Sequence, residues 1–264
     1  MTTTPLSPTS TDPTLSLAGR RAVVTGSTSG IGAATVRLLA ARGAHVVVAG
    51  RDAGRGEAVV ADVRRAGGSA VFVPGDLTGP PDELRAVAAA WAEALGGPVD
   101  LLVHNAALCP PVDTFSLTDA DLEATLAVNV RAPHVLTAAL APPMIEAGGG
   151  AIVVIGSWMA TVGHAIVGLY SATKAAEEQL ARSWAAELGP RGVRVNTVSP
   201  GATRTPVNAA ADDVIATMTA GTPAGRPGTP DEVAATVAWV VSDQAAYVHG
   251  ATIAVDGGIT ATRG

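Results

Sequence analysis

Short apolar runs alternate with longer segments of helical spacing from about residue 20 to the end of the chain. The apolar runs are rich in Val, Ala and Ile: Ala22–Thr25, His45–Ala49, Ala70–Val73, Val99–His104, Ala151–Ile155, Val193–Val198 and Thr252–Val255. Strands that are apolar throughout are buried on both faces, which is typical of a parallel sheet covered by helices. The pattern therefore predicts seven buried strands.

The segments between these runs are dominated by Ala, Leu, Glu and Arg and have the apolar spacing of helices: Gly32–Arg42, Arg55–Ala66, Asp82–Leu95, Asp119–Leu140, Leu169–Leu188 and Asp231–Val241. Regular alternation of strands and helices predicts a doubly wound, Rossmann-like α/β fold, with a mostly parallel seven-stranded sheet and helices on both faces. We expect a single domain over residues 15–264, preceded by a flexible tail, rich in Thr, Ser and Pro, at residues 1–14.

Composition narrows the classes of partner. A chain of 264 residues that is 48% hydrophobic can bury a full core in one domain. The net charge of −6 leaves no basic stripe for nucleic acid, and no apolar run reaches the roughly 18–20 residues of a membrane span. The first residues lack the features of a secretory signal, and the single cysteine, Cys109, excludes an internal disulfide framework. We therefore expect a cytoplasmic protein that acts on small molecules.

A glycine-rich turn, Thr25-Gly26-Ser27-Thr28-Ser29-Gly30-Ile31-Gly32, follows the first strand and opens the first helix. Gly26 permits a tight reversal, while Gly30 and Gly32 keep side chains away from a pyrophosphate and from the contact between helix and strand. The free N–H groups at the start of the helix then face the phosphates. In this strand–turn–helix context the turn predicts a dinucleotide site, although glycines also occur in other βα turns.

The end of the second strand distinguishes the two nicotinamide coenzymes. NAD-binding proteins usually place an acid there for the ribose 2′-hydroxyl. Here the corresponding position is Gly50, and Arg51 follows it. Because a guanidinium suits phosphate oxygens, NADP(H) is favoured over NAD(H). Two alternatives stay open: Arg51 is a solvated loop residue, or Asp52 is the ribose acid.

Tyr170 and Lys174 stand four residues apart, and therefore on one face of a predicted helix, with Ser157 thirteen residues before the tyrosine. Lowering the pKa of a tyrosine from about 10 to about 8 requires roughly 2.7 kcal/mol. An ammonium about 4 Å away supplies about 4 kcal/mol at an effective dielectric near 20, unless burial of the phenolate cancels it. Tyr170 is thus the candidate acid/base and Ser157 the candidate donor to the substrate oxygen. The alternative is that these side chains only pack or face solvent.

Together these motifs resemble the short-chain dehydrogenase/reductase family, and the similarity extends from about Leu17 to Gly258. Further matching segments are Gly75-Asp76-Leu77, His104-Asn105-Ala106-Ala107, Val128-Asn129-Val130, Ser199-Pro200-Gly201 and Val255-Asp256-Gly257-Gly258. One departure is Ala107, where the family usually has glycine. His104 also differs from the family's usual asparagine, and we expect it to support the end of its strand.

The resemblance implies roles for residues that the chemistry alone does not assign. Asn129 joins the catalytic set of Ser157, Tyr170 and Lys174 by bending its helix and positioning a water connected to the lysine. The implied cofactor-binding residues are Gly26, Ser27, Ser29, Gly30, Ile31, Gly32, Arg51, Asp76, Leu77, Asn105, Ala106, Tyr170, Lys174, Pro200, Gly201, Thr203 and Thr205. Neither the motifs nor the resemblance implies a metal.

The combined prediction is an NADP(H)-dependent oxidoreductase that interconverts a carbonyl and an alcohol. Residues 206–229, rich in Ala, Thr, Pro and Gly, are predicted to form a lid over the substrate. Apolar residues predicted to border the site favour a largely apolar substrate: Leu108, Trp158, Met159 and Ile166. The family's habit of pairing the helices at 119–140 and 169–188 implies a homotetramer, with a homodimer as the alternative. Competing functions are the NAD(H)-dependent reaction, a non-redox reaction on the same fold, and cofactor sensing without catalysis.

Overall fold

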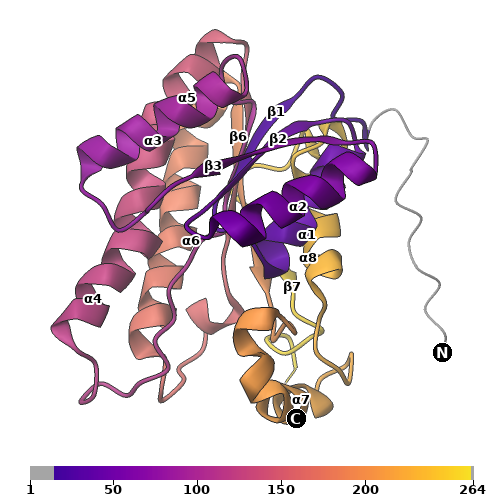
Figure 1. The fold of residues 1–264 in the computed structure, drawn as a ribbon. Helices are drawn as coiled ribbons and strands as arrows, with labels where there is room; N and C mark the ends of the chain where they lie inside the picture. The colour runs from indigo at the N-terminus through magenta and orange to yellow at the C-terminus, as the bar shows by residue number, and fades with distance from the viewer. Residues whose placement is uncertain (1–14, 263–264) are drawn as a thin grey trace.

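A seven-stranded parallel sheet forms the centre of the protein in the computed structural model, which describes residues 15–262 (Figure 1). The strands are β1 (Arg21–Val24), β2 (His45–Gly50), β3 (Ser69–Pro74), β4 (Leu101–His104), β5 (Gly150–Ile155), β6 (Val193–Pro200) and β7 (Thr252–Val255). Each strand pairs in parallel with its neighbours, so the sheet is parallel throughout rather than mostly parallel. The expected tail at residues 1–14 lies outside the described residues.

The strand order, β3-β2-β1-β4-β5-β6-β7, locates the place where a ligand can bind. The chain first builds outward from β1 through β2 to β3, and then returns to place β4 on the other side of β1. In open parallel sheets of this kind, ligands bind beyond the carboxyl ends of the strands at this reversal. The glycine turn follows β1, and Asn105 follows β4, so both predicted cofactor segments lie at that point.

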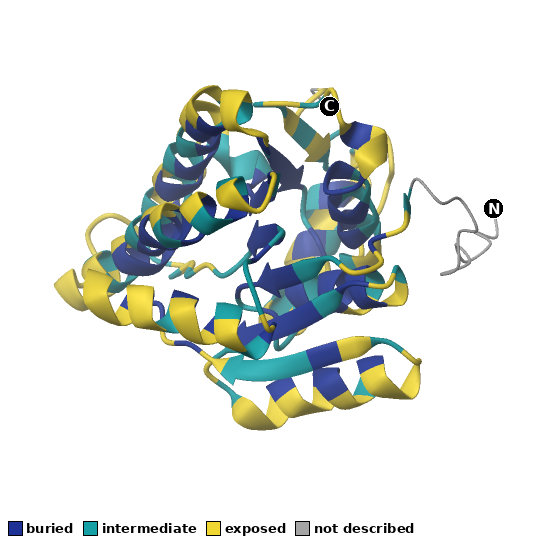
Figure 2. Cartoon of the chain, turned by 90° about the horizontal axis from the view of Figure 1, so that it is seen from above, coloured by how far each residue is buried: buried dark blue, intermediate teal, exposed yellow. Residues whose placement is uncertain are grey.

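Helices cover both faces of the sheet (Figure 1). One layer contains α1 (Gly30–Ala41), α2 (Ala53–Arg65) and α8 (Pro230–Val240), and the other contains α3 (Pro81–Ala94), α5 (Ala132–Glu146) and α6 (Gly168–Leu188). Because side chains alternate along a strand, Val46 and Val48 of β2 enter the first core while Val47 and Ala49 enter the second. Figure 2 shows the buried sides of the helices turned toward the sheet. These two apolar interfaces hold the strand ends in fixed positions.

The remaining helical segments lie in the connections. They are α4 (Asp119–Leu126), a π-helical segment (Ala127–Arg131), α7 (Asp212–Ala220) and four 3₁₀ turns at Trp158–Ala160, Gly189–Arg191, Pro206–Ala211 and Asp243–Ala245. The single helix expected over residues 119–140 is therefore interrupted, and residues 206–229 contain a helix that was not expected. Within residues 15–262, no helix combines the length and apolar character that crossing a bilayer requires.

Candidate active site

The glycine turn after β1 has the backbone geometry that the sequence predicts. Gly26 and Gly30 have φ angles of +61° and +54°, values that side chains other than glycine rarely adopt. A Cβ added to Gly26 would lie 2.7 Å from the Cα of Ala106, and one added to Gly32 would lie 2.5 Å from the Asn105 amide nitrogen. The turn is thus packed so closely against the end of β4 that two of its positions admit no side chain.

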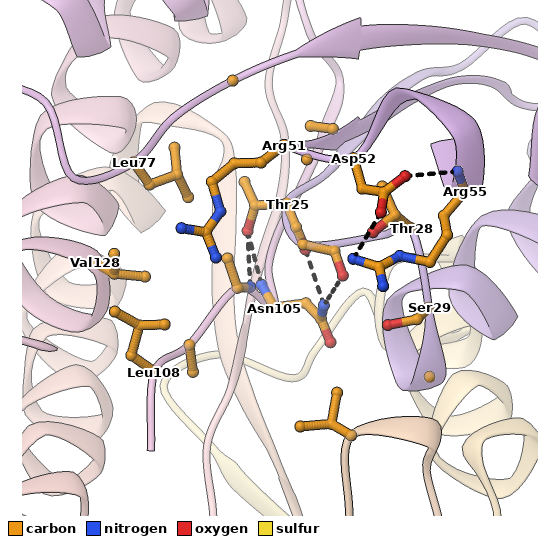
Figure 3. A pocket seen from close by; sticks show the side chains of 18 of the residues that line it. Thr25, Thr28, Ser29, Arg51, Asp52, Arg55, Leu77, Asn105, Leu108 and Val128 are labelled. Atoms are coloured by element: carbon orange, nitrogen blue, oxygen red, sulfur yellow. Dashed lines mark hydrogen bonds and ion pairs between the residues drawn. The ribbon is translucent and has the colours of Figure 1, made fainter. Parts of the chain in front are cut away.

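Hydrogen bonds tie the turn to the segment after β4. The Asn105 side-chain amide donates to the carbonyl oxygens of Thr25 (2.8 Å) and Gly26 (3.0 Å). The Thr25 hydroxyl in turn accepts from the backbone N–H groups of Asn105 (3.0 Å) and Ala106 (3.1 Å). Figure 3 shows this group at the base of a cleft between the two strand ends. The structure therefore gives Asn105 a positioning role as well as a place in the cleft.

The end of β2 borders the same cleft (Figure 3). Arg51 extends across the cleft and makes no hydrogen bond or ion pair within residues 15–262. Asp52, by contrast, caps α2: its carboxylate accepts from the Arg55 N–H at 2.9 Å and pairs with the Arg55 guanidinium at 3.2 Å. A Cβ at Gly50 would approach the Thr28 methyl carbon to 2.6 Å, so an acid at position 50 would displace Thr28.

Most of the predicted cofactor residues line this cleft, namely Gly26, Ser29, Gly30, Ile31, Arg51, Asp76, Leu77, Asn105, Ala106 and Thr205. Ser27 lies beneath it: its hydroxyl donates to the Val24 carbonyl at 2.7 Å and accepts from the Ala49 N–H at 3.0 Å. Sequence reasoning missed Thr28, Arg55, Val128 and Val207, which also line the cleft. Arg55 stands in the first turn of α2, four residues after Arg51, and a second arginine so near the predicted phosphate-binding one is a signal that could have identified it.

Asp76, which follows β3, also lines the cleft. Its carboxylate accepts from the N–H and the hydroxyl of Thr78, at 2.9 and 2.8 Å. These hydrogen bonds, followed by the charge of Arg51, hold the pKa of Asp76 below its ordinary value despite partial desolvation. Asp76 is therefore ionised at neutral pH.

The loop after β6 reaches the same cleft through Thr205. Gly201 packs so closely on Asp256 that an added Cβ would lie 2.6 Å from its Cα. The Thr203 hydroxyl donates to the Gly201 carbonyl at 3.0 Å, and the Asn208 side chain bridges Thr203 and Thr205. Thr205 lines the cleft, whereas Pro200, Gly201 and Thr203 shape the loop that carries it.

Ser157 and Tyr170 meet near the carboxyl end of β5. Ser157 follows the strand, and its hydroxyl accepts from the Met159 N–H at 3.2 Å. Burial raises the pKa of Tyr170 above 10, while Lys174 and the nearby Ser157 hydroxyl act in the opposite direction. The pKa that the lysine alone would produce is therefore not reached in this structure, because desolvation of the phenolate is the larger effect.

Lys174 is buried one helical turn beyond the tyrosine, with only 2% of its side chain exposed. Its ammonium lies 5.8 Å from the centroid of the Tyr170 ring, donates to the Ile155 carbonyl at 2.7 Å and contacts the Glu177 carboxylate at 2.7 Å. Burial lowers the pKa of Lys174, but Glu177 and the phenol outweigh it, so the pKa lies above 10.5. The lysine is accordingly a permanent positive charge beside Tyr170.

Asn129 is fully buried inside the π-helical segment. Its amide accepts from the Leu108 N–H at 2.8 Å and donates to the Leu108 carbonyl and the Thr173 hydroxyl, both at 2.9 Å. A π-helical turn inside a helix frequently marks a functional position. Here it turns a polar side chain inward, where Asn129 ties α6 to the loop after β4.

Two further polar groups border the catalytic residues. His104 is buried and shares a hydrogen bond of 2.9 Å with the Thr137 hydroxyl; burial lowers the pKa of His104 to about 3, so it is neutral. This supports the expected structural role at the strand end. Glu178, beside Glu177 on α6, accepts from the Ser199 hydroxyl at 3.4 Å. Among residues 15–262, no group of three or more His, Cys, Asp and Glu side chains could hold a metal ion.

Comparisons with known proteins agree with this arrangement. A family model described as enoyl-(acyl carrier protein) reductase matches residues 26–260. The chain is 41% identical over 246 residues to cis-4-hydroxycyclohexanecarboxylate dehydrogenase of Sinomonas cyclohexanicum, covering 92% of this chain and 98% of that protein.

Two solved structures are also similar. A short chain dehydrogenase/reductase family protein has 43% identity and a TM-score of 0.84, with 93% of this chain and 99% of that one covered. A putative NAD(P) dependent gluconate 5-dehydrogenase from Beutenbergia cavernae, with NADP bound at low occupancy, has 39% identity and a TM-score of 0.88, with 94% and 99% covered. The chain therefore belongs to the short-chain dehydrogenase/reductase family of NAD(P)-dependent oxidoreductases.

Proposed function

We propose that this protein is an NADP(H)-dependent dehydrogenase/reductase that interconverts a ketone or aldehyde with the corresponding alcohol, using Tyr170 as the general acid/base. The observation that carries the proposal is the cluster of buried Ser157 and Lys174 with half-buried Tyr170 near the carboxyl end of β5, on the sheet edge that also carries the glycine-rich cleft. Either feature alone occurs in many proteins. Their combination supplies a dinucleotide site and a proton donor at one edge of one sheet.

The residues of the cleft fit a dinucleotide. The positive-φ glycines and the close contacts of Gly26 and Gly32 leave backbone, rather than side chains, facing the place of the pyrophosphate. We assign the adenine side to Asp76 and Leu77, and the nicotinamide side to Thr203, Thr205 and Lys174. A bound nicotinamide ring would give a hydride to the carbonyl carbon, or accept one from the alcohol.

Each catalytic side chain has a defined task in this proposal. During reduction Tyr170 donates its phenolic proton to the substrate oxygen, and during oxidation the phenolate takes the proton back. Ser157 donates a hydrogen bond to the same oxygen as negative charge develops there. Lys174 stabilises the phenolate electrostatically, and Asn129 holds Leu108 and Thr173 in place around it.

The preference for NADP(H) rests on the end of β2. Arg51 is exposed and without an ion-pair partner within residues 15–262, whereas the carboxylate of Asp52 already caps α2. A free guanidinium attracts a 2′-phosphate, and a carboxylate committed to a helix cap is poorly placed to bind a ribose hydroxyl. Two structures in the family, including the one from Beutenbergia cavernae, have NADP bound, which agrees with this preference.

The substrate is proposed to be small and largely apolar. Leu108, Val128 and Val207 line the cleft, and Leu108 is hydrogen-bonded to Asn129. We propose that residues 206–229, which contain α7 and carry Val207, close over the substrate as a lid. The ring alcohol named for the Sinomonas relative is compatible with such a site, so cyclic ketones belong among the first compounds to test.

We further propose a homotetramer, or failing that a homodimer, built on α5 and α6. Ala175 and Ala176 of α6 are only half-buried in the monomer, and Ala172 is exposed, so small side chains on this helix leave room for close approach of a second copy. Sedimentation analysis of the purified protein tests this assembly. A monomer would contradict it.

The proposed reaction is tested by following absorbance of reduced nicotinamide across a panel of cyclic and acyclic ketones, with NADPH and NADH in parallel. We expect ketone-dependent oxidation that is faster with NADPH at low coenzyme concentration. Product formation without coenzyme oxidation would indicate a non-redox reaction. Coenzyme binding without any product would indicate a sensor.

A further inference from the structure

Glu177 is a buried carboxylate that the proposed reaction does not use. Only 1% of its side chain is exposed, and its Oε2 lies 2.7 Å from the Lys174 ammonium. Apart from this ion pair, neither carboxylate oxygen has a hydrogen-bond partner within residues 15–262. A buried carboxylate with one partner is unfavourable for folding, because its lost hydration is only partly replaced.

The adjacent Glu178 shows that helix α6 can satisfy a carboxylate in another way. Glu178 accepts a hydrogen bond from the Ser199 hydroxyl at 3.4 Å, which ties α6 to β6. Glu177 makes no comparable contact with a loop or strand. Its single interaction is with the side chain that controls Tyr170, which indicates a role in the chemistry of the site rather than in the packing of the helix.

The contact changes the charge that the tyrosine experiences. The Lys174 ammonium donates one hydrogen bond, to the Ile155 carbonyl, and forms an ion pair with the Glu177 carboxylate at 2.7 Å. The two measured distances place the Glu177 carboxylate within about 9 Å of the Tyr170 ring, close enough to oppose a phenolate in a poorly solvated site. The Lys174–Glu177 pair has no net charge when Glu177 is ionised.

Other titratable groups around the cluster do not duplicate this effect. His104 at the end of β4 is neutral because burial lowers its pKa to about 3. Burial raises the pKa of the Cys109 thiol, which approaches from the loop after β4. Burial likewise raises the pKa of Glu177, to about 7, and Lys174 opposes that change. Glu177 therefore changes its charge within the neutral pH range. Burial also raises the pKa of the neighbouring Glu178.

We propose that Glu177 is a positioning residue of the catalytic cluster: it holds the Lys174 ammonium away from the cleft and, by partly neutralising it, keeps Tyr170 a proton donor, which favours carbonyl reduction. This inference rests on the proposed function for its biological meaning. Its physical content, the effect of one carboxylate on one phenol, can be measured without any substrate.

The composition of the chain makes that measurement direct. There are two tyrosines, Tyr170 and Tyr247, and Tyr247 is fully exposed. In a Tyr247→Phe parent, ultraviolet absorbance of the phenolate reports Tyr170 alone. Glu177→Gln in this parent should move the titration of Tyr170 to lower pH by about one unit or more, the shift expected from a charge within about 10 Å at an effective dielectric near 20.

Two further variants and two further measurements make the result specific. Glu177→Asp keeps the charge and should return the titration toward that of the parent. Glu187→Gln removes one exposed carboxylate from the same helix, about 15 Å further along it, and should change nothing. Circular dichroism at each pH confirms that the compared proteins are folded. The pH profile of alcohol oxidation should shift in the same direction as the phenolate titration.

The proposal is overturned if phenolate forms in Glu177→Gln at the same pH as in the parent or at higher pH, or if Glu187→Gln gives an equal shift. An unchanged titration in a protein that reduces ketones would refute only the role of Glu177. A clear shift in a protein that turns over no ketone would refute only the proposed function.

Discussion

The two halves of the site are built by different means. Around the glycine turn, backbone groups and small side chains pack at contact distance. Gly26 leaves no room for a Cβ beside Ala106, and the side-chain amide of Asn105 donates a hydrogen bond to the Thr25 carbonyl in the turn. Around Tyr170, by contrast, polar and charged side chains are buried together, including Lys174, Glu177 and Asn129. Close packing stabilises the first half. In the second half, the surrounding structure must offset the unfavourable free energy of desolvating polar and charged groups.

This difference explains how one sheet edge can hold both a dinucleotide site and residues for acid–base chemistry. A dinucleotide needs a rigid surface without side chains, and such a surface tolerates almost no change in shape. Acid–base chemistry needs a group whose pKa can move, and burial with a few charged neighbours provides it. Substitutions in the first half should therefore act through steric fit, and those in the second through charge and hydrogen bonding.

The largest effect is expected in the turn. Gly26→Ala combines a positive φ with a Cβ 2.7 Å from the Ala106 Cα, so coenzyme affinity should fall about 100-fold or more. Gly96→Ala is the matched control, because Gly96 has a φ of +71° but no atom within 4 Å of an added Cβ. It should cost only about 1 kcal/mol of stability and leave coenzyme binding unchanged. Titration of coenzyme fluorescence measures the coenzyme affinity of both variants. An equal loss of affinity in the two variants would argue against the steric explanation.

The next effect is expected at Asn129. Asn129→Ala removes a fully buried amide and leaves the N–H and carbonyl of half-buried Leu108 and the buried Thr173 hydroxyl without these partners, which should reduce the free energy of unfolding by about 2–4 kcal/mol. Asn208→Ala, which also removes bonds to neighbouring residues but in a partly exposed loop, should cost about 1 kcal/mol. Denaturant unfolding distinguishes the two. Similar values would mean that the π-helical segment does not depend on this amide.

A pH-dependent effect is expected at Glu177. Because burial raises its pKa to about 7 in the folded state, from an ordinary value near 4.5, the carboxyl stabilises the protein most below pH 4.5. This contribution is lost as pH rises through about 7. Glu177→Gln, which resembles the protonated form, should match the parent at pH 4.5 and be more stable at pH 8, by up to about 3 kcal/mol. A variant less stable than the parent at pH 8 would show that the ion pair is favourable overall.

A smaller effect is expected at the end of β2. Arg51→Ala removes a guanidinium with no ion-pair partner within residues 15–262, so the KM for NADPH should rise about 10-fold to 50-fold while that for NADH changes little. Arg55→Ala is the comparison, since Arg55 is already paired with Asp52. Steady-state kinetics measures the KM for both coenzymes. An equal rise in KM for NADPH and NADH would contradict the role assigned to Arg51.

The sequence predicted the sheet and the turn because both follow from local patterns. Apolar runs such as His45–Ala49 coincide with strands, and the family motifs lie at the strand ends where the fold requires them. The parallel order of all seven strands agrees with the expected fold class. These features depend on periodicity and on short segments, which a single chain displays directly.

The features that sequence missed depend on contacts between distant segments. The resemblance implies a bend at Asn129, but no periodicity reveals that its amide bonds to Leu108 or that the bend is a π-helical segment. Glu177 has the i, i+3 spacing of an ordinary surface ion pair with Lys174, and only the fold shows that both are buried. The expected lowering of the Tyr170 pKa by the lysine was likewise outweighed by burial, whose extent is a tertiary property.

The most direct test of the account is the turnover of Tyr170→Phe, measured beside coenzyme binding to the same protein. The substitution removes one oxygen from a ring that stays packed, so the glycine-lined half should be unaffected. We predict a fall in kcat of about 1,000-fold with coenzyme affinity within about twofold of the parent. A phenylalanine variant that still reduces ketones at the parent rate would contradict the role of Tyr170 as the acid and base.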